Sequence, residues 1–272
     1  VNCFTKKGEK YVDIYFAVNH IVYKSAKNKL KKIRGKVYLT GSPRIDLWKK
    51  KYHKIFKEDV DSIKKKYKNF YLFNSDFQYI TENYRDEALD YLKPDQLKDW
   101  NLGKIKNLTK RRVKLAKSLN AEFNDAVKNI KKISKKLKNN IIVRPHPGEN
   151  KFTWKNRLKN EEKIKVVSPV DDVFPWILAS KGVIHRGCTT SLQSLFINKP
   201  TFFLYLGKKY LDNYKLKKVS FEFSTRIIPE KINIKYINKV KKKNNFFNNY
   251  LGIQNQKDSC DAMIEIFEKH FV

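Results

Sequence analysis

Two polar segments of this chain carry side chains that can bind a phosphate group. The first is Arg-Pro-His-Pro at residues 144–147, and the second is His-Arg-Gly-Cys-Thr-Thr-Ser at residues 185–191. Each follows a short apolar run, at residues 141–143 and 183–184, which is typical of a strand covered on both faces of a parallel sheet. Because parallel strands end at one edge of their sheet, the two segments predict a phosphate site at that edge.

Prolines and hydroxyl residues shape these segments. Pro145 and Pro147 stiffen the backbone and prevent a helix, so that Arg144 and His146 stand at the end of the strand. In the second segment a glycine forms the turn, and the hydroxyl residues at 189–191 begin a helix. The first N–H groups of a helix are unpaired and carry a partial positive charge, and hydroxyls there add donors.

Each signal also has a structural interpretation. Thr189 or Ser191 could be an N-cap and nothing more, and His146 an ordinary residue of a surface turn. For either turn alone the two interpretations are evenly balanced. Both turns follow predicted strands of one alternating series, and for that reason we favour a binding site.

Two further strand ends carry acidic side chains. A Gly-Ser-Pro turn at residues 41–43 leaves Arg44 and Asp46 at the edge of a predicted strand. Asn-Ser-Asp at residues 74–76 follows the predicted strand 70–73. A turn-capping role for each Asp stays open beside a catalytic one.

The elements that must position these residues alternate along the chain. Strands are predicted at residues 12–18, 35–40, 70–73, 141–143, 163–167, 183–184 and 200–205. Helices are predicted at residues 21–32, 50–67, 121–137, 173–180, 189–197 and 258–270. This alternation indicates an α/β protein with doubly wound, Rossmann-like parallel sheets.

The pattern divides into two domains. We assign residues 1–48 to the C-terminal part of a first Rossmann-like domain and residues 49–68 to a linker helix. Residues 69–272 form the second domain, with a charged helical insertion at 78–118. The chain begins with Val and enters what reads as the middle of an α/β domain, so we expect the first domain to be truncated.

Composition narrows the class of protein. The 272 residues are 41% hydrophobic and 14% aromatic, which argues against general disorder. The formal charge of +33 comes from Lys spread along the whole chain, whereas a nucleic-acid binder usually gathers its charge on one arm or face. We therefore expect no nucleic-acid partner, but attraction to phosphorylated substrates or an anionic membrane. Cys3, Cys188 and Cys260 have no metal or disulfide spacing, which favours a reducing compartment.

Five motifs in series carry a resemblance to a known family. They are residues 41–47, residues 74–77, residues 144–147, Trp176 on its helix and residues 185–191. The series resembles the bacterial surface carbohydrate biosynthesis proteins, which are GT-B glycosyltransferases related to capsule and lipopolysaccharide Kdo transferases. The two phosphate turns are also similar to those of CDP-glycerol glycerophosphotransferases and bacterial sialyltransferases. The resemblance covers residues 12–206.

The resemblance implies a GT-B enzyme that needs neither metal nor cofactor and whose C-terminal domain holds a nucleotide-sugar donor. The donor phosphate and nucleotide would be bound by Arg144, His146, Glu149, His185, Thr189, Thr190 and Ser191. The candidate catalytic carboxylates, as base or nucleophile, are Asp76 and Asp46. Arg44, Asn74 and Ser75 would line the cleft between the domains.

The function implied is a glycosyltransferase of capsule or lipopolysaccharide biosynthesis. It would transfer Kdo or a related keto sugar from a CMP-activated donor to a glycolipid or oligosaccharide acceptor. Two alternatives stay open, a CDP-glycerol glycerophosphotransferase and a non-catalytic basic protein that binds nucleic acid or membrane. UDP-sugar 2-epimerases share the architecture, but the chain does not carry their full set of acidic residues. We expect a cytoplasmic protein that contacts the inner face of the plasma membrane.

Overall fold

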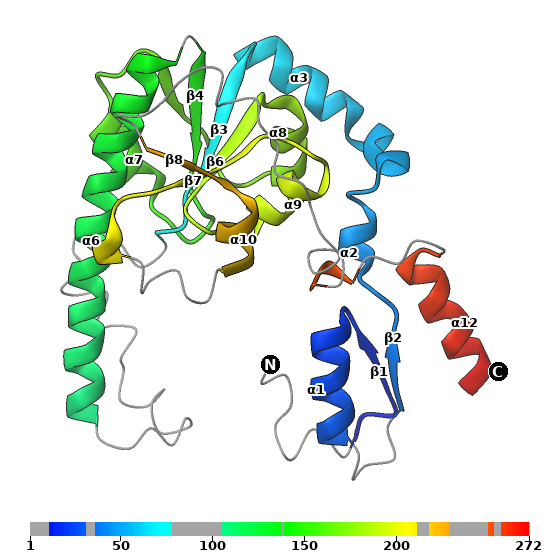
Figure 1. Cartoon of the computed structure of the whole chain (residues 1–272). Coiled ribbons are helices and arrows are strands. Elements are labelled where there is room, and N and C mark those ends of the chain that lie inside the picture. The colour runs from blue at the N-terminus through cyan, green and yellow to red at the C-terminus, as the bar shows by residue number, and fades with distance from the viewer. Residues whose placement is uncertain are drawn as a thin grey trace. The chain divides into compact units, whose positions relative to one another are not determined.

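A computed structural model describes residues 11–30, 36–77, 105–137, 139–210, 218–228, 250–252 and 257–271 of the chain. The chain forms two compact units (Figure 1). The first unit contains residues 1–55 and 242–272, and the second contains residues 56–241. Within the described residues, no helix combines the length and the apolar character needed to cross a membrane.

A parallel sheet forms the centre of the second unit. Its strands are β3 (Phe70–Asn74), β4 (Asn140–Arg144), β5 (Ile164–Val166), β6 (Gly182–His185), β7 (Thr201–Leu204) and β8 (Thr225–Ile227). They lie in the order β5-β4-β3-β6-β7-β8, and every described pairing is parallel. This is the strand order of the doubly wound dinucleotide-binding fold, in which the chain changes direction beside the first strand. The predicted α/β class with a Rossmann-like sheet is confirmed.

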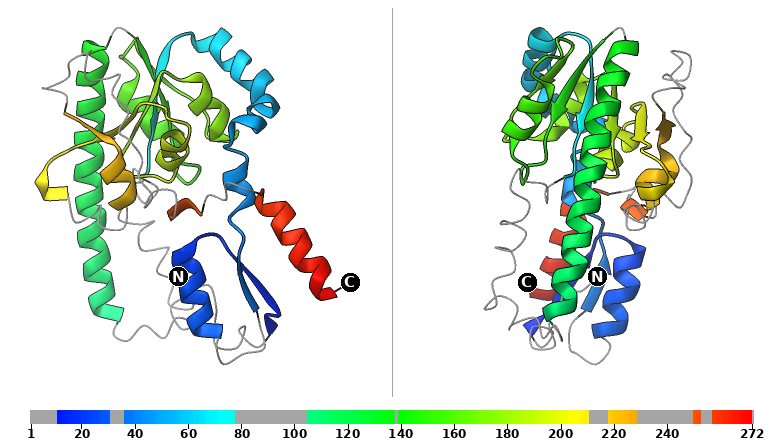
Figure 2. Two further views of the ribbon diagram at one scale, coloured as in Figure 1. Left: turned by 45° about the vertical axis from the view of Figure 1, so that its right-hand side comes forward. Right: turned by 90° about the vertical axis from the view of Figure 1, so that its left-hand side faces the viewer.

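Helices connect the strands and cover both faces of the sheet. They are α3 (Lys57–Tyr67), α6 (Ile105–Lys136), α7 (Lys151–Leu158), α8 (Val173–Ala179), α9 (Thr190–Phe196) and α10 (Lys218–Phe223). The helix α6 lies along one face in every view, whereas α3 and α8 lie on the other side (Figure 1 and Figure 2). Two of the helices begin at side-chain caps, since Asn150 accepts the N–H of Phe152 and Asp172 accepts the N–H of Phe174.

The strand β3 is buried on both faces, as a central strand of such a sheet must be. Because side chains alternate along a strand, Tyr71 and Phe73 pack in the cluster on the α6 side. Phe70 points the other way and meets Trp176 of α8 with ring centroids 6.3 Å apart. The apolar run at 70–73 therefore serves two cores at once.

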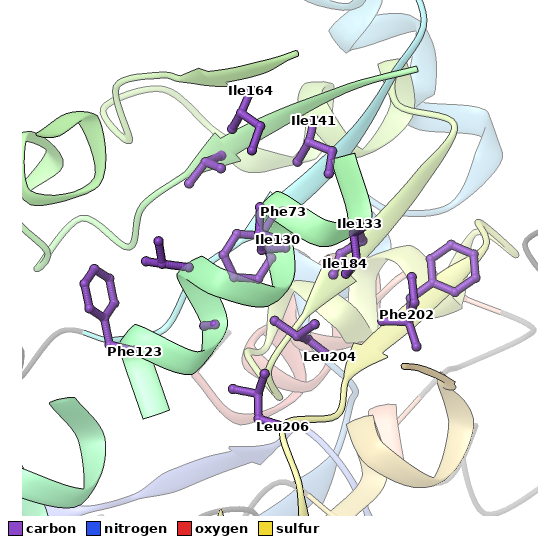
Figure 3. Packing of buried hydrophobic residues seen from close by; sticks show 14 of the residues in the cluster. Phe73, Phe123, Ile130, Ile133, Ile141, Ile164, Ile184, Phe202, Leu204 and Leu206 are labelled. Carbon is purple, nitrogen blue, oxygen red and sulfur yellow. The ribbon is translucent and has the colours of Figure 1, made fainter. Parts of the chain in front are cut away.

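The core on the α6 side follows the helical period. Ile130 and Ile133 of α6 lie in one cluster with Ile141 and Ile184 of the sheet (Figure 3), and Phe123, two turns before Ile130, packs on the ring of Trp154. The helix is longer than predicted, because it begins at Ile105 instead of residue 121. Residues 105–118, which we assigned to an insertion, are therefore part of α6, and the rest of that predicted insertion lies outside the described residues.

The first unit contains one described βαβ element. The strands β1 (Ile14–Ala17) and β2 (Lys36–Leu39) pair in parallel and are joined through α1 (His20–Leu30). The helix α2 (Pro43–Asp46) and the 3₁₀ helix η2 (Lys50–Phe56) follow. The predicted linker helix at 49–68 is thus divided between η2 and α3, and the unit boundary falls between residues 55 and 56.

The C-terminal helix α12 (Ser259–Phe271) belongs to the first unit, although we assigned residues 69–272 to one domain. Asp258, directly before α12, pairs with Lys49 at 2.7 Å and with Lys51 at 2.5 Å. Hydrogen bonds from Lys49 and the other neighbours hold the pKa of Asp258 well below its usual range. Polar contacts with the start of the chain, which an apolar pattern does not reveal, therefore decide where this helix packs.

The packing of α6 gives a testable prediction. Ile130 is fully buried, so replacing it by Ala should lower the free energy of unfolding by about 2–5 kcal/mol through lost burial and a cavity. Lys128→Ala is the control, since Lys128 is exposed on the same helix and should change stability by less than about 0.5 kcal/mol. Equal effects of the two substitutions in urea unfolding would contradict this packing.

Candidate functional site

The two predicted phosphate turns follow the strands on either side of β3. Asn74, the last residue of β3, is in register with Arg144 of β4 and with His185 of β6. Neighbouring strands lie about 4.8 Å apart, so the ends of β4 and β6 are separated by about 10 Å. Both turns consequently leave the sheet at the same edge, beside the point where the strand order reverses.

Side chains at the end of β3 connect these turns. Asn74 donates from Nδ2 to Oγ1 of Thr190 at 3.1 Å. The next residue, Ser75, donates its hydroxyl to the carboxylate of Glu149. Asn74 is only 3% exposed, and its Oδ1 accepts no hydrogen bond from the residues that the structure describes. The consecutive residues Asn74 and Ser75 thus bind one turn each.

His146 retains a hydrogen-bond donor at this edge. It is partly exposed, and its Nδ1 accepts the N–H of Gly148 at 3.0 Å. Because Nδ1 acts as an acceptor, the ring proton lies on Nε2. No hydrogen bond joins Nε2 to the described part of the chain, so this N–H can donate to a ligand.

The hydroxyl groups of the second turn differ in their roles. Ser191 is fully buried and donates to the carbonyl of Cys188 at 2.6 Å, which makes it part of the turn itself. Thr190 accepts from Asn74 and lies 2.7 Å from Sγ of Cys188. Thr189 is exposed and makes no capping hydrogen bond with its side chain. Thr189 is therefore the hydroxyl of this turn best placed to meet a ligand.

Cys188 is a small buried residue of the second turn. Burial raises the pKa of its thiol, so the neutral form is favoured at pH 7. A thiol in this state is a poor nucleophile. Its contacts with Thr190 and with the carbonyl of Asn74 hold the turn against β3.

His185, predicted to bind the donor, is fully buried in the structure. Its Nδ1 accepts the N–H of Gly187 at 2.9 Å, and its Nε2 lies 2.7 Å from the hydroxyl of Ser224. That hydroxyl donates to the carbonyl of Ser220, so Nε2 of His185 must be the donor to Ser224. Burial lowers the pKa of His185 to about 3. The geometry does not support a ligand role, because both ring nitrogens are bonded inside the protein.

The charged groups of Arg144 and Glu149 are also hydrogen-bonded to other parts of the protein. Arg144 is buried and donates to the carbonyls of Pro169 and Asp171, in the loop after β5. Burial lowers its pKa below the usual value for arginine. Glu149 accepts from Ser75, from the N–H of Phe77 at 2.6 Å and from the indole N–H of Trp154 at 2.7 Å. Both residues shape the first turn, and neither carboxylate oxygen of Glu149 is without a partner.

The two candidate catalytic carboxylates belong to different units. Asp76 lies in the second unit, directly after β3, and is partly exposed. Asp46 lies in the first unit and is 6% exposed, and its carboxylate pairs with Lys49 at 2.7 Å and accepts the N–H of Ser259 at 2.5 Å. The contacts of Asp46 match the turn-capping alternative. Arg44, beside it, is exposed.

Arg186 and Glu122 are buried residues of this edge that the sequence interpretation missed. Their side chains form an ion pair at 2.6 Å between Nη1 and Oε2. Arg186 also donates from Nη2 to the carbonyl of Asp76 at 2.8 Å. The available signal was Glu122 itself, an acidic residue beside Leu119, Phe123 and Ala126 on the apolar face of a helix.

Comparisons with known proteins identify the fold class. No protein-family model matches the chain, and neither does any curated protein sequence. Among solved structures the similar proteins have the GT-B fold, with parallel sheets like those described above. The chain therefore has an α/β fold of the GT-B type.

The similar solved structures include two of the enzyme UDP-GlcNAc 2-epimerase from Methanocaldococcus jannaschii. These two structures align with TM-scores of 0.51 and 0.53 at 17% and 16% identity, and each alignment covers 94% of this chain. A variant of the wall teichoic acid polymerase TagF aligns with a TM-score of 0.53 at 14% identity over 95% of this chain. The chain spans only 61%, 62% and 59% of the lengths of these proteins.

The buried His185 predicts a pH dependence of stability. Its folded pKa of about 3 lies below the ordinary 6.5, so between these values the unfolded chain binds a proton that the native protein does not. Stability that is present above pH 6.5 is therefore lost as the pH falls toward 3. From pH 6.5 to 4.5 this group alone should lower the free energy of unfolding by about 2–3 kcal/mol.

His185→Gln removes the titrating group and should make the loss of stability over this range smaller by that amount. Urea unfolding at pH 6.5 and at pH 4.5 gives the change in free energy of unfolding for each protein. Any destabilisation by the substitution that does not depend on pH cancels in this change. His20→Gln, at an exposed position, is the control substitution. A His185→Gln variant with the pH dependence of the wild type would contradict the assignment.

Proposed function

We propose that the chain is a transferase of surface-polymer assembly that uses a nucleotide-activated donor. The observation that carries this proposal is the position of the two turns, which flank β3 at the reversal of strand order. Open α/β sheets bind ligands outside the carboxyl ends of their strands at such a point. The likeness in fold to a wall teichoic acid polymerase and to an epimerase solved with UDP-GlcNAc and UDP supports the proposal.

The donor phosphate would bind between the two turns. His146 would donate from Nε2, and Thr189 from its hydroxyl, to the phosphate oxygens. Such donors stabilise the charge that develops on a departing nucleotide phosphate, and they do so without a divalent ion. Asp76 is the candidate base or nucleophile of this unit, because it is the partly exposed carboxylate beside the turns.

Two donors fit this chemistry. The resemblance of the motifs favours a CMP-activated keto sugar such as Kdo, with transfer of the sugar to a glycolipid or oligosaccharide. The resemblance of the two phosphate turns to those of CDP-glycerol glycerophosphotransferases favours CDP-glycerol, with transfer of glycerol phosphate, and the likeness in fold to a wall teichoic acid polymerase agrees with this donor. Both reactions release CMP, but they leave different groups on the acceptor, a sugar in one case and glycerol phosphate in the other. Incubation with each donor in turn, followed by mass spectrometry, separates CMP-sugar transfer from glycerophosphate transfer.

Replacement of His146 tests the phosphate site. Hydrogen bonds to a charged group contribute roughly 1.5–3 kcal/mol, so His146→Ala should weaken CMP or CDP binding by about 10- to 100-fold. Isothermal titration calorimetry on the chain measures this change. The control is His20→Ala, because His20 lies in the first unit and is exposed.

Two results would count against the proposal. The wild-type chain could fail to bind any cytidine or uridine nucleotide, which would remove the donor site. Alternatively, His146→Ala could bind as tightly as the His20→Ala control, which would place the phosphate elsewhere. Binding of duplex DNA or anionic vesicles with a steep salt dependence, and of no nucleotide, would favour the non-catalytic alternative.

A further inference from the structure

We propose that Glu149 and Arg186 are positioning residues that clamp the segment at the end of β3 from both sides. This segment, residues 74–77, is called the edge segment below, and it contains the candidate carboxylate Asp76. The inference rests on the proposed function, because it concerns the geometry that the proposed transfer reaction needs. Neither Glu149 nor Arg186 is required to touch the donor.

Glu149 forms the first arm of the clamp. Its carboxylate accepts the hydroxyl of Ser75 and the backbone N–H of Phe77, so two residues of the edge segment bind one side chain. The indole N–H of the buried Trp154 binds the same carboxylate and fixes its orientation. The N–H of Glu149 donates to the carbonyl of His146 at 2.8 Å. This arm therefore couples the edge segment to the turn that carries His146.

Arg186 forms the second arm, from the opposite side. Its Nη2 donates to the carbonyl of Asp76 at 2.8 Å, and its guanidinium lies 4.3 Å from the ring centroid of Phe77. The stacking of a guanidinium on an aromatic face is attractive and restricts both groups. Arg186 follows β6 directly, so this arm couples the edge segment to the turn that carries Thr189 and Thr190.

Glu122 keeps the second arm in place. It is fully buried on α6, and its carboxylate lies 2.6 Å from Nη1 of Arg186, which is also buried. A buried charge is strongly destabilising unless it is paired, so each of the two residues requires the other. The guanidinium is thereby fixed between α6 and the edge segment.

The clamp has a consequence for Asp76. Asn74, Ser75 and Phe77 are buried, whereas Asp76 is partly exposed. The peptide group that joins Asp76 to Phe77 is therefore held at both its N–H and its carbonyl, while the carboxylate of Asp76 remains near the surface. Misplacing a reacting group by about 1 Å can lower a rate about 100-fold, so fixing this backbone matters for the transfer step more than for binding.

Two conservative substitutions test the clamp. Glu149→Gln keeps the size of the side chain but leaves one acceptor oxygen in place of two, so it cannot keep Ser75 and Trp154 on one oxygen and the Phe77 N–H on the other. Arg186→Lys keeps a positive charge for Glu122, but it loses the planar group that reaches the Asp76 carbonyl and stacks on Phe77. Glu162→Gln is the control, because Glu162 is exposed.

Two readouts are compared, the release of CMP from the donor and the exchange of backbone amides followed by NMR. In both variants kcat should fall at least about 10-fold, while the Kd for CMP changes less than about threefold. The Phe77 amide should exchange at least about 10-fold faster in Glu149→Gln, because the one remaining oxygen keeps the two donors Ser75 and Trp154 and the NH₂ group then faces the Phe77 N–H. Glu149→Asp, which restores a carboxylate, should recover part of kcat.

The outcomes are separable. If the wild-type chain turns over the donor, and both variants have the wild-type kcat and the wild-type rate of Phe77 amide exchange, the clamp is overturned. The proposed function would then remain intact. A purely structural role, seen as a lower Tm with no change of kcat at a temperature where both variants are folded, would overturn it as well. Failure of the wild-type chain to bind or release any nucleotide would instead overturn the proposed function, and with it the catalytic consequence of the clamp.

Discussion

The candidate site depends on two hydrogen bonds made by consecutive residues at the end of β3. Asn74 bonds Thr190 in one turn, and Ser75 bonds Glu149 in the other. Parallel pairing brings the turns to the same edge, but it does not fix the distance between loops that leave the sheet. These side-chain bonds, together with Arg186 on the Asp76 carbonyl, fix the three loops as one structure. The phosphate-binding geometry proposed above exists only as long as they are made.

Burial explains why several polar residues of the turns are structural. A polar group removed from water must find a partner within the protein, and the buried Arg144, His185 and Ser191 have all found one nearby. Among the candidate residues of this edge, His146, Thr189 and Asp76 lie near the surface, where a ligand can reach them. The site is thus smaller than its motifs suggest, and the remaining motif residues stabilise the loops that present it.

Much of the fold was predictable because its signals are local. The apolar runs at 70–73 and 183–184 and the helical pattern at 173–180 all correspond to elements of the described structure. The sequence-based predictions were incomplete where contacts between residues far apart in the chain determine the packing. The C-terminal helix packs with the first unit through Asp258 and its lysine partners, and no periodic pattern in residues 258–270 indicates this. The ion pair of Glu122 with Arg186 likewise joins residues far apart in the chain. The sequence also predicted that both turns leave the sheet at one edge, but it did not show which of their side chains are bonded inside the protein.

We propose above that a donor phosphate lies at the sheet edge between the turns after β4 and β6. A crystal structure of the chain soaked with CDP tests this most directly. We expect a phosphate group within hydrogen-bonding distance of Nε2 of His146 and of the Thr189 hydroxyl, with the edge segment unmoved. A nucleotide bound at the other edge of the sheet, or bound with its phosphates away from both turns, would contradict it.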